Sequence, residues 1–241
     1  LNRSKVLVLS EDKDIFGGEL DNTILKDQLN LMRVGEPMYV FYGYVEDGYD
    51  ENGHIVYKNM DDDPAITAAD KTIIGDPNPD FLVNLTTSVS YKGFTLSAFL
   101  QSSIGNDIYS LSMAAQAYDY GYNGNTLREV YYNHWTPENP TAKYPNLDQT
   151  SYKMSDRFVY DGSFVRLKNL ELAYDVPCAR SKFIKRARVY VSAQNLFTIT
   201  SYPFWDPDIN ANGGGSSMIQ GVDSYCYPSA RTYTLGCRLT F

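Results

Sequence analysis

The sequence contains little histidine, cysteine or tryptophan and no long hydrophobic run. Its 241 residues include 2 His, 3 Cys and 2 Trp, against 21 Tyr and 11 Phe. A membrane-spanning helix needs about 20 consecutive apolar residues, so the sequence excludes one. A spanning β-strand needs only about 9–11 residues with every second residue apolar, and it leaves no hydrophobic run. A membrane protein that crosses the bilayer with β-strands is therefore still compatible with the sequence.

The charge balance and the cysteines exclude further classes. The formal net charge is −8, whereas a nucleic-acid-binding protein needs clustered Lys and Arg to displace counterions from phosphate. We therefore predict no nucleic-acid partner. Cys178, Cys226 and Cys237 follow no CxxC or Cys/His metal spacing, and a Cys226–Cys237 disulfide is left open. The chain starts at Leu1 and not at Met, which predicts a fragment or a processed chain.

The clearest pattern is a two-residue alternation, which is typical of β-strands with one apolar face. From Phe81 to Tyr91 the odd positions are mostly apolar and the even positions carry mostly small polar groups. The pattern resumes after Lys92-Gly93, which predicts a tight hairpin. Further alternating segments are 94–104, 164–176, 187–199 and 233–241. In 164–176 the phase changes near Lys168-Asn169, which predicts a β-bulge.

The connections between these predicted strands differ strongly in length. Lys92-Gly93 and 177–186 are short, whereas 105–160 and 200–230 are long and rich in Gly, Asn, Pro, Tyr and Asp. If the strands alternate in direction, all short connections lie at one end and all long ones at the other. This asymmetry is typical of outer-membrane barrels, which have short periplasmic turns and long external loops.

Residues 1–78 alternate less regularly. Arg3–Ser10 and Met38–Val45 look extended, but glycine and proline interrupt the pattern. We interpret 1–78 as the end of a barrel strand followed by a large extracellular loop region, in which most of 11–78 is a surface-exposed insertion. Residues 125–135 are predicted to form a short helix inside a later loop.

A soluble β-sandwich is the alternative interpretation, because alternation alone does not distinguish it from a barrel. In a barrel the apolar faces of 81–91, 94–104 and 233–241 all face lipid. In a sandwich these faces pack against each other. The alternative function is a secreted soluble β-sandwich that binds polysaccharide.

Seven segments resemble the SusC/RagA family of TonB-linked (TonB-dependent) outer-membrane transporters, in the same order along nearly the whole chain. They are FYGYVEDG at 41–48, TIIGDPNPDF at 72–81, YKGF at 91–94, NHWTPENP at 133–140, DRFVYDGSFVRLKNL at 156–170, RVYVSAQNLF at 188–197 and YPSARTYTLGCRLTF at 227–241. The resemblance implies an all-β fold, the C-terminal antiparallel strands of a transmembrane β-barrel of about 22 strands with long extracellular loops. Residues 79–241 would supply the last five strands, and the plug domain and the N-terminal barrel would lie outside this chain.

The same resemblance implies a function and partners. The whole protein would import oligosaccharides or peptides across the bacterial outer membrane, with TonB acting through the plug and a SusD-like surface lipoprotein as partner. The last strand resembles the signal read by the barrel-insertion machinery. Its apolar positions are Tyr233, Leu235, Leu239 and Phe241.

An acidic segment resembles a calcium loop. Counted from the first residue, oxygen ligands stand at positions 1, 3, 5, 7 (a backbone carbonyl), 9 and 12, which are Asn59, Asp61, Asp63, Ala65, Thr67 and Asp70. Two residues depart from the pattern, because Pro64 replaces the turn glycine and Asp70 replaces the closing Glu. The alternative is an acidic solvated loop without an ion. No other cofactor is expected.

No catalytic arrangement is recognised. His54 and His134 lie in no nucleophile motif, and the pair Asp206 and Asp208 is one of many carboxylate pairs in an acidic chain. We therefore predict no catalytic residue and no enzyme.

Loop aromatics are the candidates for stacking on sugars or peptide side chains. They are Tyr118, Tyr120, Tyr122, Trp135 and Trp205. The alternative is that they pack the loops or form an interfacial aromatic girdle.

Overall fold

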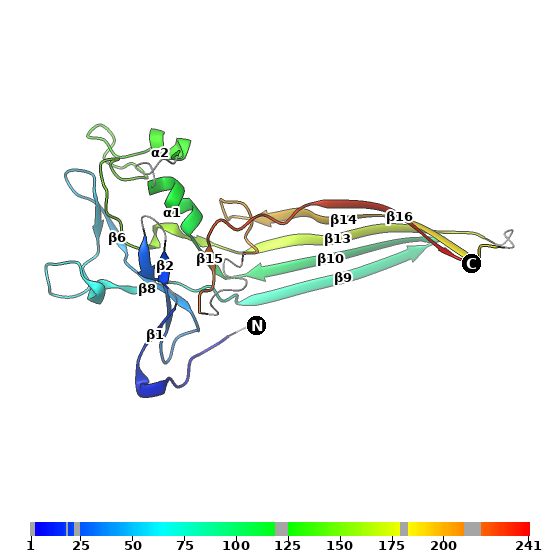
Figure 1. The fold of residues 1–241 in the computed structure, drawn as a ribbon, viewed down its shortest axis with the longest axis horizontal. Coiled ribbons are helices and arrows are strands. Elements are labelled where there is room, and N and C mark those ends of the chain that lie inside the picture. The colour runs from blue at the N-terminus through cyan, green and yellow to red at the C-terminus, as the bar shows by residue number, and fades with distance from the viewer. Residues whose placement is uncertain (1–2, 18, 22–24, 119–124, 179–182, 210–217) are drawn as a thin grey trace.

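The computed structural model describes residues 3–17, 19–21, 25–118, 125–178, 183–209 and 218–241, and it has two parts (Figure 1). The first is a long sheet of five strands, here called the wall. The second is a compact head, formed by the described residues of 3–80, 105–163 and 201–231. The head lies at one end of the wall, and the C-terminus lies near the other end (Figure 1).

All neighbouring strands of the wall are antiparallel, in the order β16-β14-β13-β10-β9. Their bounds are β9 Phe81–Tyr91, β10 Phe94–Ile104, β13 Phe164–Val176, β14 Arg186–Thr200 and β16 Thr232–Thr240. These bounds agree with the five predicted strands to within one residue, which confirms the antiparallel all-β prediction. The long connections join the strands at the head end and the short ones join them at the opposite end, as expected (Figure 1).

Two local features of the wall were also predicted correctly. Lys92 and Gly93 have φ angles of 47° and 89°, and positive φ at both central residues is what a tight two-residue hairpin requires. The pairing of β13 with β14 shifts register at Lys168, which is the expected β-bulge. Opposite this shift, Asn195 in β14 has a φ of 50°, a second irregularity that the alternation did not predict.

The register brings the apolar residues of all five strands to one face of the wall. One row across the sheet consists of Val89, Leu96, Leu172, Val191 and Leu235. These side chains are 44–86% exposed. The opposite face is polar, and there Ser88 Oγ and Ser97 Oγ lie 3.0 Å apart on neighbouring strands. The wall thus has one uncovered apolar face and one polar face.

This arrangement overturns the β-sandwich alternative. Residues 81–91, 94–104 and 233–241 lie in one sheet with their apolar sides on the same face, not in two sheets facing each other. Within the described part of the chain, no second sheet covers this face. A contiguous exposed apolar surface of this extent is typical of contact with a membrane or a partner, not of a soluble monomer.

The head consists of short strands, helices and loops. Its sheets have the orders β1-β4-β5-β8 and β12-β11-β15, and β2-β3 and β6-β7 are hairpins. The strand bounds are β1 Ile15–Phe16, β2 Glu19–Asp21, β3 Lys26–Gln28, β4 Asn30–Met32, β5 Val40–Gly43, β6 Glu46–Tyr49, β7 Ile55–Tyr57, β8 Thr72–Gly75, β11 Asp107–Ser110, β12 Val159–Asp161 and β15 Val222–Asp223. The helices are α1 Leu111–Tyr118 and α2 Arg128–Tyr132, with 3-10 turns at Ser10–Asp12, Ala68–Asp70 and Asp156–Phe158. None of the helices that the structure describes is long and apolar enough to cross a membrane.

The head has a buried core shared by distant segments. Leu29 and Phe41 from the first part of the chain pack in one cluster with Tyr109, Val130 and Phe158. Leu29 and Phe41 are therefore core positions within a segment that was expected to be mostly surface-exposed. Leu29 lies between the three-residue strands β3 and β4, and Phe41 lies in the four-residue strand β5. Strands this short show no alternation, and residues far away in the sequence bury both side chains.

Three further segments of the head differ from what the sequence analysis gave. Helix α1 was not predicted because nearly all its side chains are buried, so it has no polar face to mark a helical period. The helix expected over 125–135 is shorter and covers only Arg128–Tyr132. In the segment Arg3–Ser10, residues 3–9 form no strand and Ser10 begins a 3-10 turn. The described contacts of this segment include a backbone hydrogen bond of 2.9 Å from Val6 N to Glu36 O.

Candidate functional site

The wall and the head meet around a buried arginine on the polar face. Arg166, near the head end of β13, is 2% exposed. Its Nε donates to Thr198 Oγ1 on β14 (2.9 Å), and its guanidinium pairs with Asp206 and, at 3.3 Å, with Asp208. A buried charge is costly unless it is paired and hydrogen-bonded. The two carboxylates therefore hold residues 206–208 of the head against the wall.

Asp206 joins the two ends of the long connection between β14 and β16. Its carboxylate accepts hydrogen bonds from the backbone amides of Asp208 and Ser229, each at 2.9 Å. Burial alone would raise the pKa of Asp206. The two amides and the Arg166 guanidinium outweigh that effect and lower the pKa below its ordinary value of 3.8. Asp206 is therefore ionised at neutral pH.

A second buried polar cluster ties the same connection to the core of the head. The Tyr202 hydroxyl donates to Asp223 Oδ2 at 2.6 Å and lies 2.8 Å from Ser110 Oγ. Ser112 Oγ donates to Asp223 Oδ1 at 3.1 Å. Burial and the neighbouring carboxylate raise the pKa of Tyr202, which keeps its hydroxyl protonated as a donor. The described ends of this connection are thus anchored both to the wall and to the start of α1.

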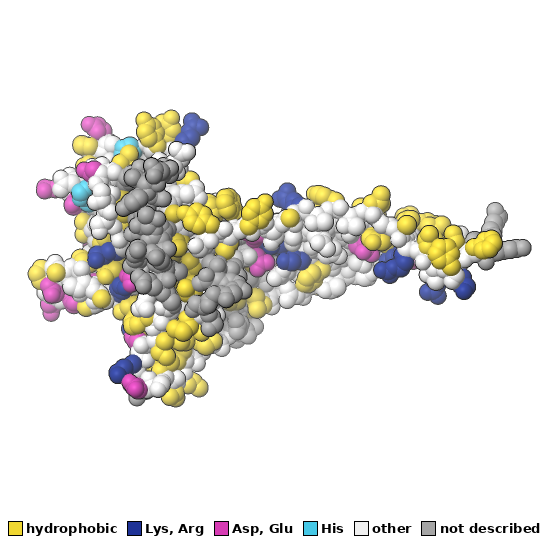
Figure 2. Space-filling model, viewed as in Figure 1, with side chains coloured by type: hydrophobic (Ala, Val, Ile, Leu, Met, Phe, Trp, Pro, Cys, Tyr) yellow, Lys and Arg dark blue, Asp and Glu magenta, His cyan; other side chains and the backbone are white. Residues whose placement is uncertain are grey.

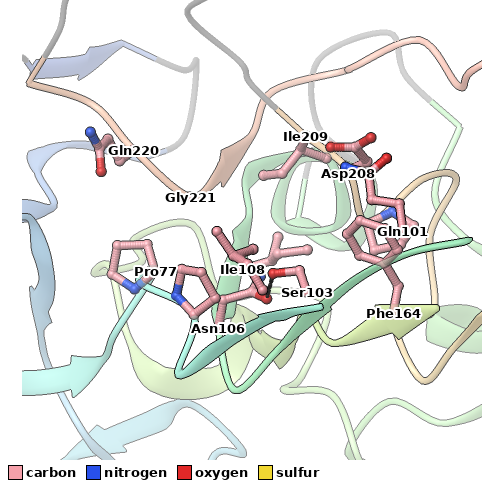
Figure 3. Close-up of a pocket in the computed structure, with 13 residues that line it drawn as sticks. Pro77, Gln101, Ser103, Asn106, Ile108, Phe164, Asp208, Ile209, Gln220 and Gly221 are labelled. Atoms are coloured by element: carbon pink, nitrogen blue, oxygen red, sulfur yellow. Dashed lines mark hydrogen bonds between the residues drawn. The ribbon is translucent and has the colours of Figure 1, made fainter. Parts of the chain in front are cut away.

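Two hollows lie on the polar face at the head end of the wall, and Pro207 lines both. The first has a volume of about 420 Å³ and lies between Gln101 of the wall and the head residues Asn106 and Gln220 (Figure 3). The second has a volume of about 330 Å³, and the aromatic ring of Trp205 forms part of its lining. Both hollows open next to the Arg166 cluster.

The lining of the hollows is suited to ligands with many hydrogen-bonding groups. In the first, Ser103 Oγ donates to Asn106 Oδ1 at 2.7 Å (Figure 3). In the second, Asn195 Nδ2 donates to Ala230 O at 2.9 Å, while the buried Asn195 Oδ1 has no hydrogen-bond partner among the described residues. Amide and hydroxyl groups beside an aromatic ring are the kind of surface that binds sugars or peptides.

The predicted cargo-contacting aromatics lie at separate places. Trp205 is 54% exposed and stacks on Phe204, with ring centroids 4.7 Å apart. Trp135 is half-buried and packs against the backbone of Gly53. Tyr118 is buried in the head core, where it stacks on Tyr152 with ring centroids 3.8 Å apart. The other two, Tyr120 and Tyr122, lie outside the described residues.

Of the three described aromatics, only Trp205 therefore lies at a hollow of the polar face. The positions of Trp135 and Tyr118 indicate loop packing. Contact of any of these residues with cargo stays a prediction.

The predicted calcium loop is closed by bonds from its own backbone. Asp70 accepts from the amides of Met60 and Thr67, both at 2.7 Å, and these bonds lower its pKa. Asp61 accepts from the amide of Asp63 at 2.8 Å. In the part of the chain that the structure describes, no group of three or more His, Cys, Asp or Glu side chains is placed to hold a metal ion. Such turns explain the acidic spacing without an ion, and calcium binding by the Asn59–Asp70 loop stays a prediction.

Three residues of the predicted assembly signal, Tyr233, Leu235 and Leu239, lie on the apolar face. Tyr233, Leu235, Leu239 and Phe241 are 46–86% exposed, and the first three belong to the edge strand β16. Recognition of this strand by the insertion machinery stays a prediction. No disulfide joins Cys226 to Cys237 in the part of the chain that the structure describes.

Arg166 is the residue of this region that the sequence analysis missed. A charged residue between Val165 and Leu167, inside a predicted strand, was a signal of a buried ion pair. Asp206 and Asp208 had been noted only as a pair without catalytic meaning. Their partner is 40 positions away from Asp206 in the sequence, and only the fold brings them together.

Comparison with known proteins identifies the relatives of this chain. No protein-family model matches it. It is 31% identical over its whole length to TonB-dependent receptor P3 of Formosa agariphila, of which it covers 26%. Over 87% of its length it is 30% identical to TonB-dependent receptor SusC of Bacteroides thetaiotaomicron, of which it covers 20%.

The fold agrees with these relatives. The structure of the RagAB peptide importer in its open-open state matches 98% of this chain with a TM-score of 0.74 and 25% identity, and the match covers 25% of that importer chain. In sequence and in fold, the chain is therefore SusC/RagA-like and similar to TonB-dependent receptors. The SusC/RagA-like chain spans about a quarter of the length of the first relatives. These relatives are receptors and an importer, not enzymes.

Proposed function

We propose that the chain forms the C-terminal part of the barrel of a TonB-dependent importer in the bacterial outer membrane, with the wall as transmembrane strands and the head as external loops. The observation that carries this proposal is the continuous apolar face across five antiparallel strands. Strands of 9–15 residues are long enough to cross the hydrocarbon layer when tilted. In lipid, the uncovered apolar face needs no protein partner.

The remaining barrel strands and the plug would complete this structure. β9 and β16 are the edges of the wall, and unpaired backbone groups at a sheet edge are too costly to leave in hydrocarbon. Each edge strand therefore pairs with a strand of the same barrel outside this chain. The polar face then lines the lumen, where the plug lies and through which TonB acts.

The cargo we propose is an oligosaccharide or a peptide, captured together with a SusD-like surface lipoprotein above the head. The two hollows beside Arg166 and the exposed ring of Trp205 support this cargo class, because they offer hydrogen-bonding groups and an aromatic face at the head end of the lumen. The similarity to the RagAB peptide importer supports a peptide as the cargo. The name of the relative SusC specifies no cargo, so an oligosaccharide remains the second candidate.

A pair of adjacent substitutions in the full-length receptor tests the orientation of the wall. Leu85 and Thr86 lie in the middle of β9 on opposite faces, and both are exposed. We expect Leu85→Arg to destabilise the folded barrel by about 2–4 kcal/mol, the cost of an arginine facing lipid near the bilayer midplane. Thr86→Arg, which faces the water-filled lumen, should change stability by less than about 1 kcal/mol, as substitutions at water-exposed positions usually do.

The measurement is the folded fraction in outer-membrane preparations, determined by heat-modifiable electrophoretic migration and urea titration. Equal effects of the two arginines would contradict a lipid-facing apolar side. A receptor that fractionates with soluble proteins would contradict the membrane location itself.

A further inference from the structure

The end of the wall opposite the head carries a hollow lined by basic side chains. Its volume is about 490 Å³, and its charged lining consists of Lys185, Arg186, Arg188 and Arg238 together with Asp175. Lys and Arg side chains gather at this end of the molecule in the space-filling view (Figure 2). The whole chain has a net charge of −8, so a surplus of cations here runs against its overall balance.

The strand register shows which way these side chains point. Asp175, Arg188 and Arg238 form one row across β13, β14 and β16, and Arg186 lies opposite Thr240. All of them are on the polar face, because the alternate residues of these strands form the apolar face. Arg188 and Arg238 are thus directly opposed, an arrangement of like charges that destabilises a sheet unless an anion neutralises it.

Partners within the described residues do not neutralise this cluster. Arg188 lies 3.4 Å from Asp175 and 3.7 Å from Glu171. In the ranges that the structure describes, no carboxylate oxygen pairs within 4.0 Å with the side chains of Arg186 or Arg238. Four cations against two carboxylates leave a surplus of two positive charges.

We propose that this basic hollow binds an acidic polypeptide segment of the same receptor, located outside these 241 residues and lying inside the barrel. The inference rests on the proposed function, in which the polar face lines the lumen. Charge complementarity supports an acidic partner, and about three quarters of the length of TonB-dependent receptor P3 lies outside the region matched by this chain. An anionic lipid headgroup is the less favourable occupant, because Arg188 and Arg238 share the face of Tyr190 and Gly236 and point away from the apolar side.

Zero-length cross-linking of the full-length receptor tests the proposal. A carbodiimide couples an amine to a carboxylate only when the two are in contact, and Lys185 supplies an exposed amine at the hollow. In receptor purified from outer membranes, we expect mass spectrometry to find Lys185 joined to Asp or Glu residues upstream of this chain. The double variant Arg186→Glu/Arg238→Glu should lower the yield of this product at least five-fold.

The matched control is Lys92→Glu, which changes a cation at the same end of the wall but in the β9–β10 turn, and it should leave the yield unchanged. Coupling of Lys185 only to residues of this chain, or a yield equal in all variants, overturns the proposal. So does an anionic phospholipid that co-purifies with the receptor and is lost in the double variant. Heat-modifiable migration of the same samples shows whether the barrel has folded in each variant. If the double variant does not fold, the cross-link in the wild-type receptor still tests the proposal.

Discussion

Arg166→Met removes the cation that neutralises two carboxylates at the junction of wall and head. Arg166 and Asp206 are both nearly inaccessible, at 2% and 7% exposure. Breaking a buried ion pair by removing one partner costs about 3–5 kcal/mol because the other charge stays buried. Two backbone amides still bond Asp206, so we expect the lower value, about 3 kcal/mol, as a loss of protection from hydrogen exchange over residues 204–208 in the full-length receptor.

Lys168→Met is the control for this variant. Lys168 lies 3.6 Å from Asp208, and both side chains are more than a third exposed. Such a pair contributes less than about 1 kcal/mol. If the two variants lost equal protection, the Arg166 cluster would not be the anchor of this segment.

The ionisation of Asp206 gives the same anchor a pH dependence. The pKa of Asp206 is lowered in the folded state, so its contribution to stability is present above its unfolded pKa of 3.8 and is lost as the pH falls through the folded value. We expect residues 204–208 to loosen only below about pH 4. The difference in fluorescence between the receptor and its Trp205→Phe variant reports this change, and Asp206→Asn should remove the pH step.

At the scale of the element, the last strand of the wall is tied to its neighbour by a close contact. Tyr190 in β14 is opposite Gly236 in β16, and a Cβ added at Gly236 would lie 2.4 Å from the tyrosine ring. Gly236→Ala should therefore displace this flexible ring and destabilise the barrel by about 1 kcal/mol, the lower end of the cost of overpacking. Urea titration of the folded receptor measures the change.

The double variant Tyr190→Ala/Gly236→Ala checks the cause of that loss. If the contact is responsible, adding Gly236→Ala to Tyr190→Ala costs close to nothing. An undiminished loss in the double variant would place the effect in the backbone of Gly236 instead.

Two substitutions in the Asn59–Asp70 loop test whether it is a capped turn or a calcium site. Asp70→Ala removes two hydrogen bonds to backbone amides and should lower local stability by about 1 kcal/mol in the presence of a chelator. Asp61→Ala removes one exposed bond and should have a smaller effect. If the loop binds calcium, adding Ca²⁺ increases hydrogen-exchange protection of residues 59–70 in the wild type and in neither variant. No response to Ca²⁺ would leave the turn alone as the reason for the acidic spacing.

The elements that the sequence predicted best are those with long alternating segments. From Phe81 to Ile104 the alternation and the Lys92-Gly93 turn predicted both strands and their register. In a long strand every residue must lie on either the apolar or the polar face, so each additional residue supports the same register. The phase change at Lys168 likewise predicted the bulge. In α1 and in the short strands of the head there was no such repetition. There the buried surroundings determine the local structure.

At the scale of the whole molecule, the wall and the head have different kinds of surface. The wall exposes apolar rows such as Val89 and Leu96, whereas the head buries its apolar residues in its own core. Side by side in one chain, these two patterns separate a part with an uncovered apolar face from a part with a buried core of its own. The polar cluster at Arg166 joins the two parts.

The sequence by itself determined the wall strands, the hairpin, the bulge, the end at which the long connections lie, and the resemblance to SusC/RagA. These are local or periodic properties, and they follow from side-chain alternation and turn chemistry. Only the tertiary structure decided that the five apolar faces form one uncovered surface, and not two facing each other, because that depends on which strands pair. It also decided that Arg166 meets Asp206, that residues 11–78 contribute to a buried core, and that Arg188 opposes Arg238. Each of these is a contact between residues far apart in the chain, and no local pattern specifies such contacts.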